Sequence, residues 1–131
     1  MKLINDFYHI VSTEDSEGKY VCKVKLNAAH DIYSVHFPGN PVTPGVCLVQ
    51  MATEMLEQKF GKKLVLSTAV NIKFKRLVAP HDEPSFVFSK IVTEDGLLKT
   101  IISIEDEQGQ FVKMSLQYKN RWRKRAAESY V

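Results

Sequence analysis

The sequence predicts one α+β domain, in which a single long helix packs on an antiparallel sheet. Three observations carry this prediction: residues 45–60 repeat apolar side chains at helical spacing, the segments on either side alternate as strands do, and no linker interrupts the chain. A chain of 131 residues is long enough for one core and short for two. We therefore expect 1–131 to be a single domain that ends in a basic tail at about 119–131.

The first 26 residues are expected to form two strands. Residues 7–12 are a short apolar run, and residues 13–18 are polar and turn-like. Residues 19–26 place apolar side chains at every second position, namely Tyr20, Cys22, Val24 and Leu26. That period of two indicates a strand with one buried face. Residues 27–44 contain three prolines, have no sustained period, and are expected to be a loop.

The helix is expected to begin at Gly45 or Val46 and to end near Gly61. Pro44 precedes it, where a fixed φ and a missing N–H are tolerated, and a glycine after the last turn is a common helix terminator. At 100° per residue, the apolar side chains share one face: Leu48, Val49, Met51, Ala52, Met55 and Leu56. The polar side chains share the other face: Gln50, Thr53, Glu54, Glu57 and Gln58.

Strand-like runs follow the helix, at 64–78, 85–93, 97–105 and 111–118. The acidic stretch ending in Gly96 and the stretch around Gly109 separate the last three runs, and both are typical of turns. Strands joined by short turns form an antiparallel meander. The order of elements is therefore strands, one helix, and strands again.

Composition and charge argue against several classes of protein. No apolar run approaches the ~20 residues that span a bilayer, and the first residues do not resemble a signal peptide, so we expect a cytoplasmic protein without a membrane contact. We expect the two cysteines, Cys22 and Cys47, to be reduced thiols. The net charge is +3, and basic residues crowd the tail from Lys119 to Arg125. This tail is either a solvated end or a docking patch for an acidic partner, and no motif indicates nucleic acid.

The segment from His36 to Gly45 is the most informative part of the chain. Three prolines in seven residues stiffen it, and such a loop can hold a histidine in one place. The helix that follows starts with unpaired N–H groups and a partial positive charge, which can stabilise a carbonyl oxygen that gains negative charge. The loop therefore offers a candidate base, His36, near a candidate oxyanion site at Gly45 and Val46. The structural alternative is a proline-rich connection with a partly buried histidine.

This segment resembles the signature of the bacterial 3-hydroxyacyl-(acyl-carrier-protein) dehydratases. The signature reads His-Phe-Pro-Gly-x-Pro-x-x-Pro-Gly and runs into an apolar helix, and every fixed position is present from His36 to Gly45. Residues 71–82 resemble the family's strand, in which an aromatic and basic pair leads into a proline-containing turn. The resemblance covers about 20–118 and implies the hotdog fold, an antiparallel sheet wrapped around one long central helix.

The resemblance also implies roles for site residues. His36 would be the base that removes the α-proton of a 3-hydroxyacyl thioester, and Gly45 with Val46 would hold the thioester carbonyl. Phe37 and Pro44 are expected to contact the substrate beside them. In the family the site is shared across a homodimer, and the dimers could assemble further. The substrate would be carried by acyl carrier protein, in fatty-acid or related acyl-chain synthesis, with coenzyme A as an alternative carrier.

One important position departs from the family pattern. The family has an acidic residue fourteen positions after the histidine, and this chain has Gln50 there. An amide can hydrogen-bond a hydroxyl but cannot donate a carboxylic proton, and general acid help contributes about 10²–10⁴-fold. Glu54, one helical turn later, is expected either to replace the acid or to be a solvated residue of the polar stripe. Alternatively, His36 acts as both base and acid while Gln50 orients the hydroxyl.

The remaining candidates give weaker signals. Cys47 lies in the first helical turn, where it is either a reactive thiol or a small packing residue. The other histidines, His9, His30 and His81, are expected to be structural or solvated. We expect no metal, because the spacing of ligands is wrong, and no organic cofactor, because eliminating water needs no redox carrier. Two other functions remain open: a hotdog thioesterase, and a non-catalytic acyl-binding or partner subunit.

Overall fold

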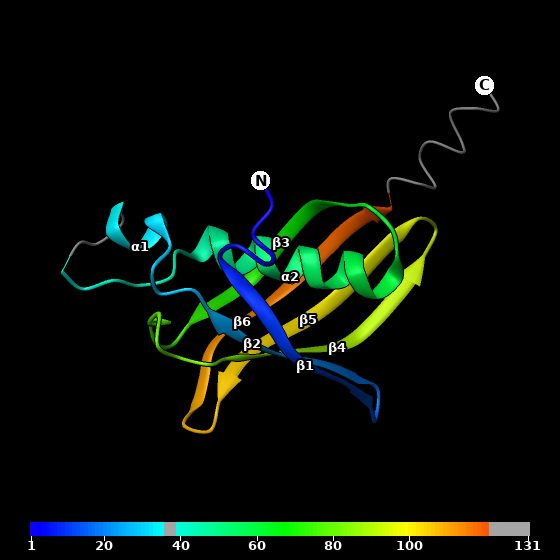
Figure 1. Cartoon of the computed structure of the whole chain (residues 1–131). Helices are drawn as coiled ribbons and strands as arrows, with labels where there is room; N and C mark the ends of the chain where they lie inside the picture. The colour runs from blue at the N-terminus through cyan, green and yellow to red at the C-terminus, as the bar shows by residue number, and fades with distance from the viewer. Residues whose placement is uncertain (36–38, 121–131) are drawn as a thin grey trace.

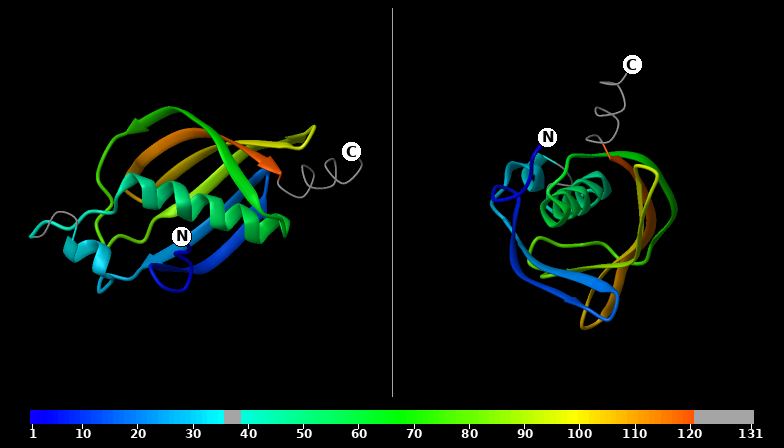
Figure 2. Two further views of the ribbon diagram at one scale, coloured as in Figure 1. Left: turned by 90° about the horizontal axis from the view of Figure 1, so that it is seen from above. Right: turned by 90° about the vertical axis from the view of Figure 1, so that its right-hand side faces the viewer.

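The computed structural model describes residues 1–35 and 39–120. Its six-stranded antiparallel sheet curls around one long helix, α2 (Gly45–Phe60), which lies against the concave face (Figures 1 and 2). The strands run in the order β1-β2-β4-β5-β6-β3, so β1 and β3 are the two edges. The architecture is the predicted one. No described helix is long and apolar enough to cross a bilayer.

The first hairpin joins β1 (Tyr8–Ser16) to β2 (Lys19–Leu26). The expected turn at 13–18 is wrong, because the strand continues to Ser16, which pairs with Lys19. The turn itself is only Glu17 and Gly18, at φ 53° and 74°. Two successive positive φ values match the twist of a tight hairpin. The polar residues that suggested a turn are the exposed side chains of an edge strand, whose backbone bonds to β2.

A short helix, α1 (Asp31–Val35), interrupts the stretch that was expected to be a loop throughout. His30 starts it, because the Ile32 N–H donates to His30 Nδ1 at 3.1 Å and the Tyr33 N–H donates to the His30 carbonyl at 3.1 Å. Tyr33 is buried and stacks on Phe7, with ring centroids 5.3 Å apart. A helix of one turn is too short to produce a hydrophobic period in the sequence.

The boundaries of α2 agree with the sequence prediction. Pro44 occupies the N-cap position at φ −61° and ψ 144°, and Gly61 ends the helix at φ 64°. The Gly61 N–H donates to the Glu57 carbonyl at 2.8 Å, which satisfies one of the last carbonyls of the helix. Apart from Val49, which is partly buried, the apolar face is buried, as expected. One polar residue is buried with it, Glu54, which is 7% exposed.

The remaining strands are β3 (Leu64–Phe74), β4 (Ser85–Glu94), β5 (Leu97–Asp106) and β6 (Gly109–Asn120). The last three form the predicted meander, β4-β5-β6. Strand β3 is shorter than the expected 64–78, because the chain bends away after Phe74. There both Lys75 and Arg76 donate their N–H groups to the Phe111 carbonyl. The Arg76 guanidinium also lies over the Phe111 ring and pairs with Asp106, so the chain after β3 is fixed to the last hairpin.

Candidate active site

The start of α2 is the first part of the site. The Pro44 carbonyl accepts the N–H groups of Cys47 and Leu48, at 3.0 and 3.3 Å. The N–H groups of Gly45 and Val46 meet no acceptor among the described residues. The Phe74 ring packs beside them, and a Cβ on Gly45 would lie 3.3 Å from it. Glycine therefore lets an aromatic side chain from β3 approach the helix terminus closely.

The signature is anchored in the core near both of its ends. Tyr33, which precedes it, and Thr43, which lies within it, share a hydrogen bond of 2.8 Å between their buried hydroxyls. The Thr43 N–H donates to the Val78 carbonyl at 2.7 Å. Burial raises the pKa of Tyr33 to about 12, so this phenol keeps its proton. The predictions for His36 and Phe37 fall outside the described residues.

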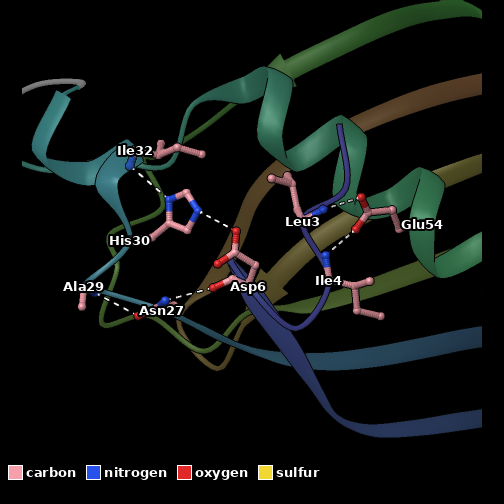
Figure 3. A network of polar contacts seen from close by, with 8 residues as sticks. All are labelled: Leu3, Ile4, Asp6, Asn27, Ala29, His30, Ile32 and Glu54. Carbon is pink, nitrogen blue, oxygen red and sulfur yellow. Dashed lines mark hydrogen bonds and ion pairs between the residues drawn. The ribbon is translucent and has the colours of Figure 1, made fainter.

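Glu54 lies at the centre of a buried polar network, and Figure 3 shows its contacts with Leu3 and Ile4 from close by. One oxygen, Oε2, accepts the Leu3 N–H at 2.7 Å and the other, Oε1, accepts the Ile4 N–H at 2.8 Å. The Tyr8 hydroxyl donates to Oε1 at 3.1 Å, and Gln50 Nε2 donates to Oε2 at 2.9 Å. The expectation of a solvated Glu54 is wrong, because residues 1–7, the N-terminal segment, cover this part of the helix.

Gln50 is half-buried beside Glu54 and bonds to the same segment. Its Nε2 donates to the Met1 carbonyl at 2.8 Å as well as to Glu54. Gln50 and Glu54 both line a cleft of about 480 Å³ between α2 and the N-terminal segment. Lys2, Lys62 and Lys63 also line this cleft, so its lining contains basic side chains as well as the Glu54 carboxylate. The structure thus brings together the two residues that the sequence placed one helical turn apart.

The N-terminal segment is the part of this region that sequence analysis missed. Burial, and then the Glu54 carboxylate, raise the pKa of Tyr8 well above its ordinary value. Leu3 and Phe7 are buried beside it. Apolar residues at 3, 4, 7 and 8 were a possible signal, but their backbone donors meet a carboxylate about fifty positions away, which no local pattern reveals.

The weaker candidates have structural surroundings. Cys47 is 3% exposed, and burial raises the pKa of its thiol, as expected of a packing residue and not of a nucleophile. His30 bonds to Asp6 at 3.2 Å, while His9 and His81 are exposed. Among the described residues, no group of three or more His, Cys, Asp and Glu side chains could hold a metal ion.

Comparison with known proteins adds a family to this geometry. Residues 12–115 match the model of the ApeI-like family, described as ApeI dehydratase. The chain belongs to this dehydratase family. The match spans most of the sheet and all of α2, so it includes the signature and Gln50. Dehydration is therefore shown at the level of the family.

Individual relatives agree with this assignment. The chain is 34% identical over 106 residues to the 3-hydroxyacyl-[acyl-carrier-protein] dehydratase FabZ of Acetivibrio thermocellus, covering 72% of this chain and 71% of that protein. It is 29% identical over 86 residues to FabZ of Clostridium acetobutylicum, covering 59% of this chain and 61% of that protein.

Two solved structures show that the fold is the hotdog fold. The dehydratase heterocomplex ApeI:P from Xenorhabdus doucetiae superposes with a TM-score of 0.68 at 14% identity, covering 85% of this chain and 96% of that one. A hypothetical thioesterase with coenzyme A from Streptococcus pneumoniae TIGR4 gives a TM-score of 0.62 at 15% identity, covering 90% and 91%. At such low identities these structures establish the fold alone. This member of the ApeI-like family therefore shares its architecture with a protein described as a hypothetical thioesterase.

Proposed function

We propose that this protein dehydrates a 3-hydroxyacyl thioester to the trans-2-enoyl thioester. The observation that carries the proposal is the junction between signature and helix: α2 begins at Gly45, the last signature residue, and the Gly45 and Val46 N–H groups meet no acceptor in the described part of the chain. A thioester carbonyl bound there would receive two N–H groups at the positive end of the helix dipole. Those donors stabilise the negative charge that forms when the α-proton leaves.

The proposed reaction balances without a cofactor. His36 takes the α-proton, the bond between carbon 3 and its hydroxyl breaks, and the protonated imidazole returns that proton to the departing hydroxyl as water. Gln50 orients the hydroxyl, while Pro44 and Phe37 contact the acyl chain. We do not assign the acid's role to Glu54, since both of its oxygens are already engaged by donors of this chain, two on each, which leaves neither oxygen turned toward a departing hydroxyl.

We propose that two chains pair along β3 to form a homodimer, which completes the site. This edge strand exposes apolar side chains along its length: Val65, Leu66, Val70, Ile72 and Phe74. The opposite edge, β1, carries Glu14 and Asp15, and charges of this kind protect an edge from pairing. The difference between the two edges supports β3 as the interface.

We propose acyl carrier protein as the carrier of the substrate, in fatty-acid or related acyl-chain synthesis. Carrier proteins are acidic, and the basic residues from Lys119 onward would attract them. Electrostatic attraction of this kind weakens with salt. A carrier-bound substrate should therefore turn over more slowly at high ionic strength, whereas a short pantetheine thioester should be little affected.

The test is a turnover assay with 3-hydroxyacyl chains on carrier protein and on coenzyme A, following enoyl formation. His36→Ala should lose at least about 10²-fold in turnover. His9→Ala is the matched control, because His9 is an exposed histidine on β1, at the opposite edge of the sheet from β3. Equal turnover in the two variants, or no enoyl product from the unmodified protein at any chain length, would refute the proposed function. Release of free thiol in the same assay would indicate a thioesterase instead.

A second candidate function is that of a non-catalytic partner subunit. Gln50 favours it, because it replaces the family's acid and its amide is already bonded to Glu54 and Met1. In that case the chain would form a heterodimer with an acid-bearing hotdog dehydratase. Co-expression with such a dehydratase, followed by mass measurement of the purified complex, distinguishes the two functions: activity that appears only in a heterodimer supports the partner role.

A further inference from the structure

The amide group of Gln50 is held in one orientation. Both of its hydrogen bonds within the described part of the chain come from Nε2, at 2.8 Å to the Met1 carbonyl and at 2.9 Å to Glu54 Oε2. A backbone carbonyl and a carboxylate can only accept hydrogen bonds. The flipped amide would place its oxygen against two acceptors, so the two contacts fix which end of the amide faces them.

Glu54 is itself immobilised. Apart from Gln50, it receives donors from Leu3, Ile4 and Tyr8, and it is 7% exposed. With two contacts on each oxygen, it cannot rotate without leaving a buried donor unpaired, which costs about 1–3 kcal/mol. The carboxylate is therefore a fixed acceptor against which the Gln50 amide is aligned.

We propose that Glu54 is a positioning residue that presents the Gln50 oxygen, Oε1, to the substrate as a hydrogen-bond acceptor, and that this selects 3-hydroxyacyl over 3-oxoacyl groups. The inference rests on the proposed function, because it assumes that the acyl group reaches Gln50. No donor contacts Oε1 among the described residues. A 3-hydroxyl can donate to that oxygen. A 3-oxo group has no proton to donate and would oppose one acceptor with another.

The test measures binding and does not depend on turnover. The probes are a 3-hydroxyacyl and a 3-oxoacyl pantetheine amide, in which nitrogen replaces the thioester sulfur. The unmodified protein should bind the hydroxy probe about tenfold more tightly, which is the size of one hydrogen bond. Glu54→Gln and Gln50→Ala should each bring the ratio close to one. Glu57→Gln is the matched control, because it removes a carboxylate from the same helix that bonds to Leu64 and not to Gln50.

A double variant separates positioning from a merely structural role. If Glu54 acts through Gln50, then Glu54→Gln should have no further effect on the ratio in a chain that already carries Gln50→Ala. Additive losses, or a Glu54→Gln protein that keeps the full preference, would overturn the proposal. Should Glu54→Gln fail to fold, the side-chain NH₂ signals of Gln50 in the unmodified protein decide the matter, since a held amide exchanges its protons slowly and a free one does not.

The outcomes distinguish this inference from the proposed function. A protein that prefers the hydroxy probe but forms no enoyl product would retain the positioning role and lose the dehydratase assignment. A protein that dehydrates its substrate but binds both probes equally would retain the assignment and lose the positioning role.

Discussion

At the scale of single residues, Glu54 illustrates how a carboxylate can be stable in a protein interior. Burial of a charge is costly unless it is paired or hydrogen-bonded, and Glu54 meets two backbone N–H groups, a phenol and an amide. None of these donors is basic, so the network is held by hydrogen bonds and not by an ion pair. Each donor therefore contributes to the stability of the segment that carries it.

Removing one of these donors should destabilise the protein measurably. Tyr8→Phe deletes a hydroxyl that lies 3.1 Å from Glu54 Oε1 and leaves the ring in the core. We expect the free energy of unfolding to fall by about 0.5–1.5 kcal/mol, as measured by urea denaturation. An unchanged unfolding midpoint would mean that the Tyr8 hydroxyl is not part of the network.

The features of this region that could be predicted from the sequence are those that nearby residues determine. The ends of α2 follow from Pro44 and Gly61, which act within one turn, so they could be predicted. The surroundings of Glu54 come from residues about fifty positions earlier, and a helical period assigned it to the solvated face. The position of Gln50 was predictable from the signature, but its bond to the Met1 carbonyl was not.

At the scale of elements, the two edge strands differ in composition, and therefore in how readily each is expected to pair with a strand of another chain. The apolar residues of β3 had indicated only a strand, because a sequence pattern does not show which strands lie at an edge. The length of β1 was underestimated for a related reason: polar residues are compatible both with a turn and with an exposed edge. Sheet order, which depends on long-range pairing, was the information that the sequence lacked.

A charge on β3 should separate the proposed dimer without unfolding the chain. Val70 is 45% exposed on β3, and Val11 is 52% exposed on the opposite edge. We expect Val70→Lys to reduce the mass in solution from twice 15.0 kDa to 15.0 kDa, as measured by light scattering. Val11→Lys should leave the dimer intact. Loss of the dimer in the Val11 variant, or its persistence in the Val70 variant, would contradict the proposed interface.

At the scale of the whole molecule, the core holds phenols that are protected from ionisation. Burial raises the pKa of Tyr33 and of Tyr118 to about 12, from an ordinary value of 10.0. It also raises the pKa values of Tyr8 and Tyr20. In the unfolded chain the same side chains are free to ionise. The folded state therefore binds more protons than the unfolded state at alkaline pH.

Stability should consequently decline in alkali. The contribution of these tyrosines is complete below the unfolded pKa of 10.0, and it is lost as the pH rises from there toward the folded values of about 12 for Tyr33 and Tyr118. Urea denaturation at about pH 9 and about pH 11 should show a lower free energy of unfolding at the higher pH. Tyrosinate absorbance that develops fully near pH 10 while the protein remains folded would contradict this expectation.

The contact between the N-terminal segment and Glu54 has a consequence for the order of folding. Residues 1–7 are synthesised before their acceptor, which lies on α2 about fifty residues later in the chain. The β4-β5-β6 meander, by contrast, joins neighbours through short turns and can form quickly. The N-terminal segment thus waits for its partner, and the cleft beside Gln50 acquires its final wall only when that segment docks.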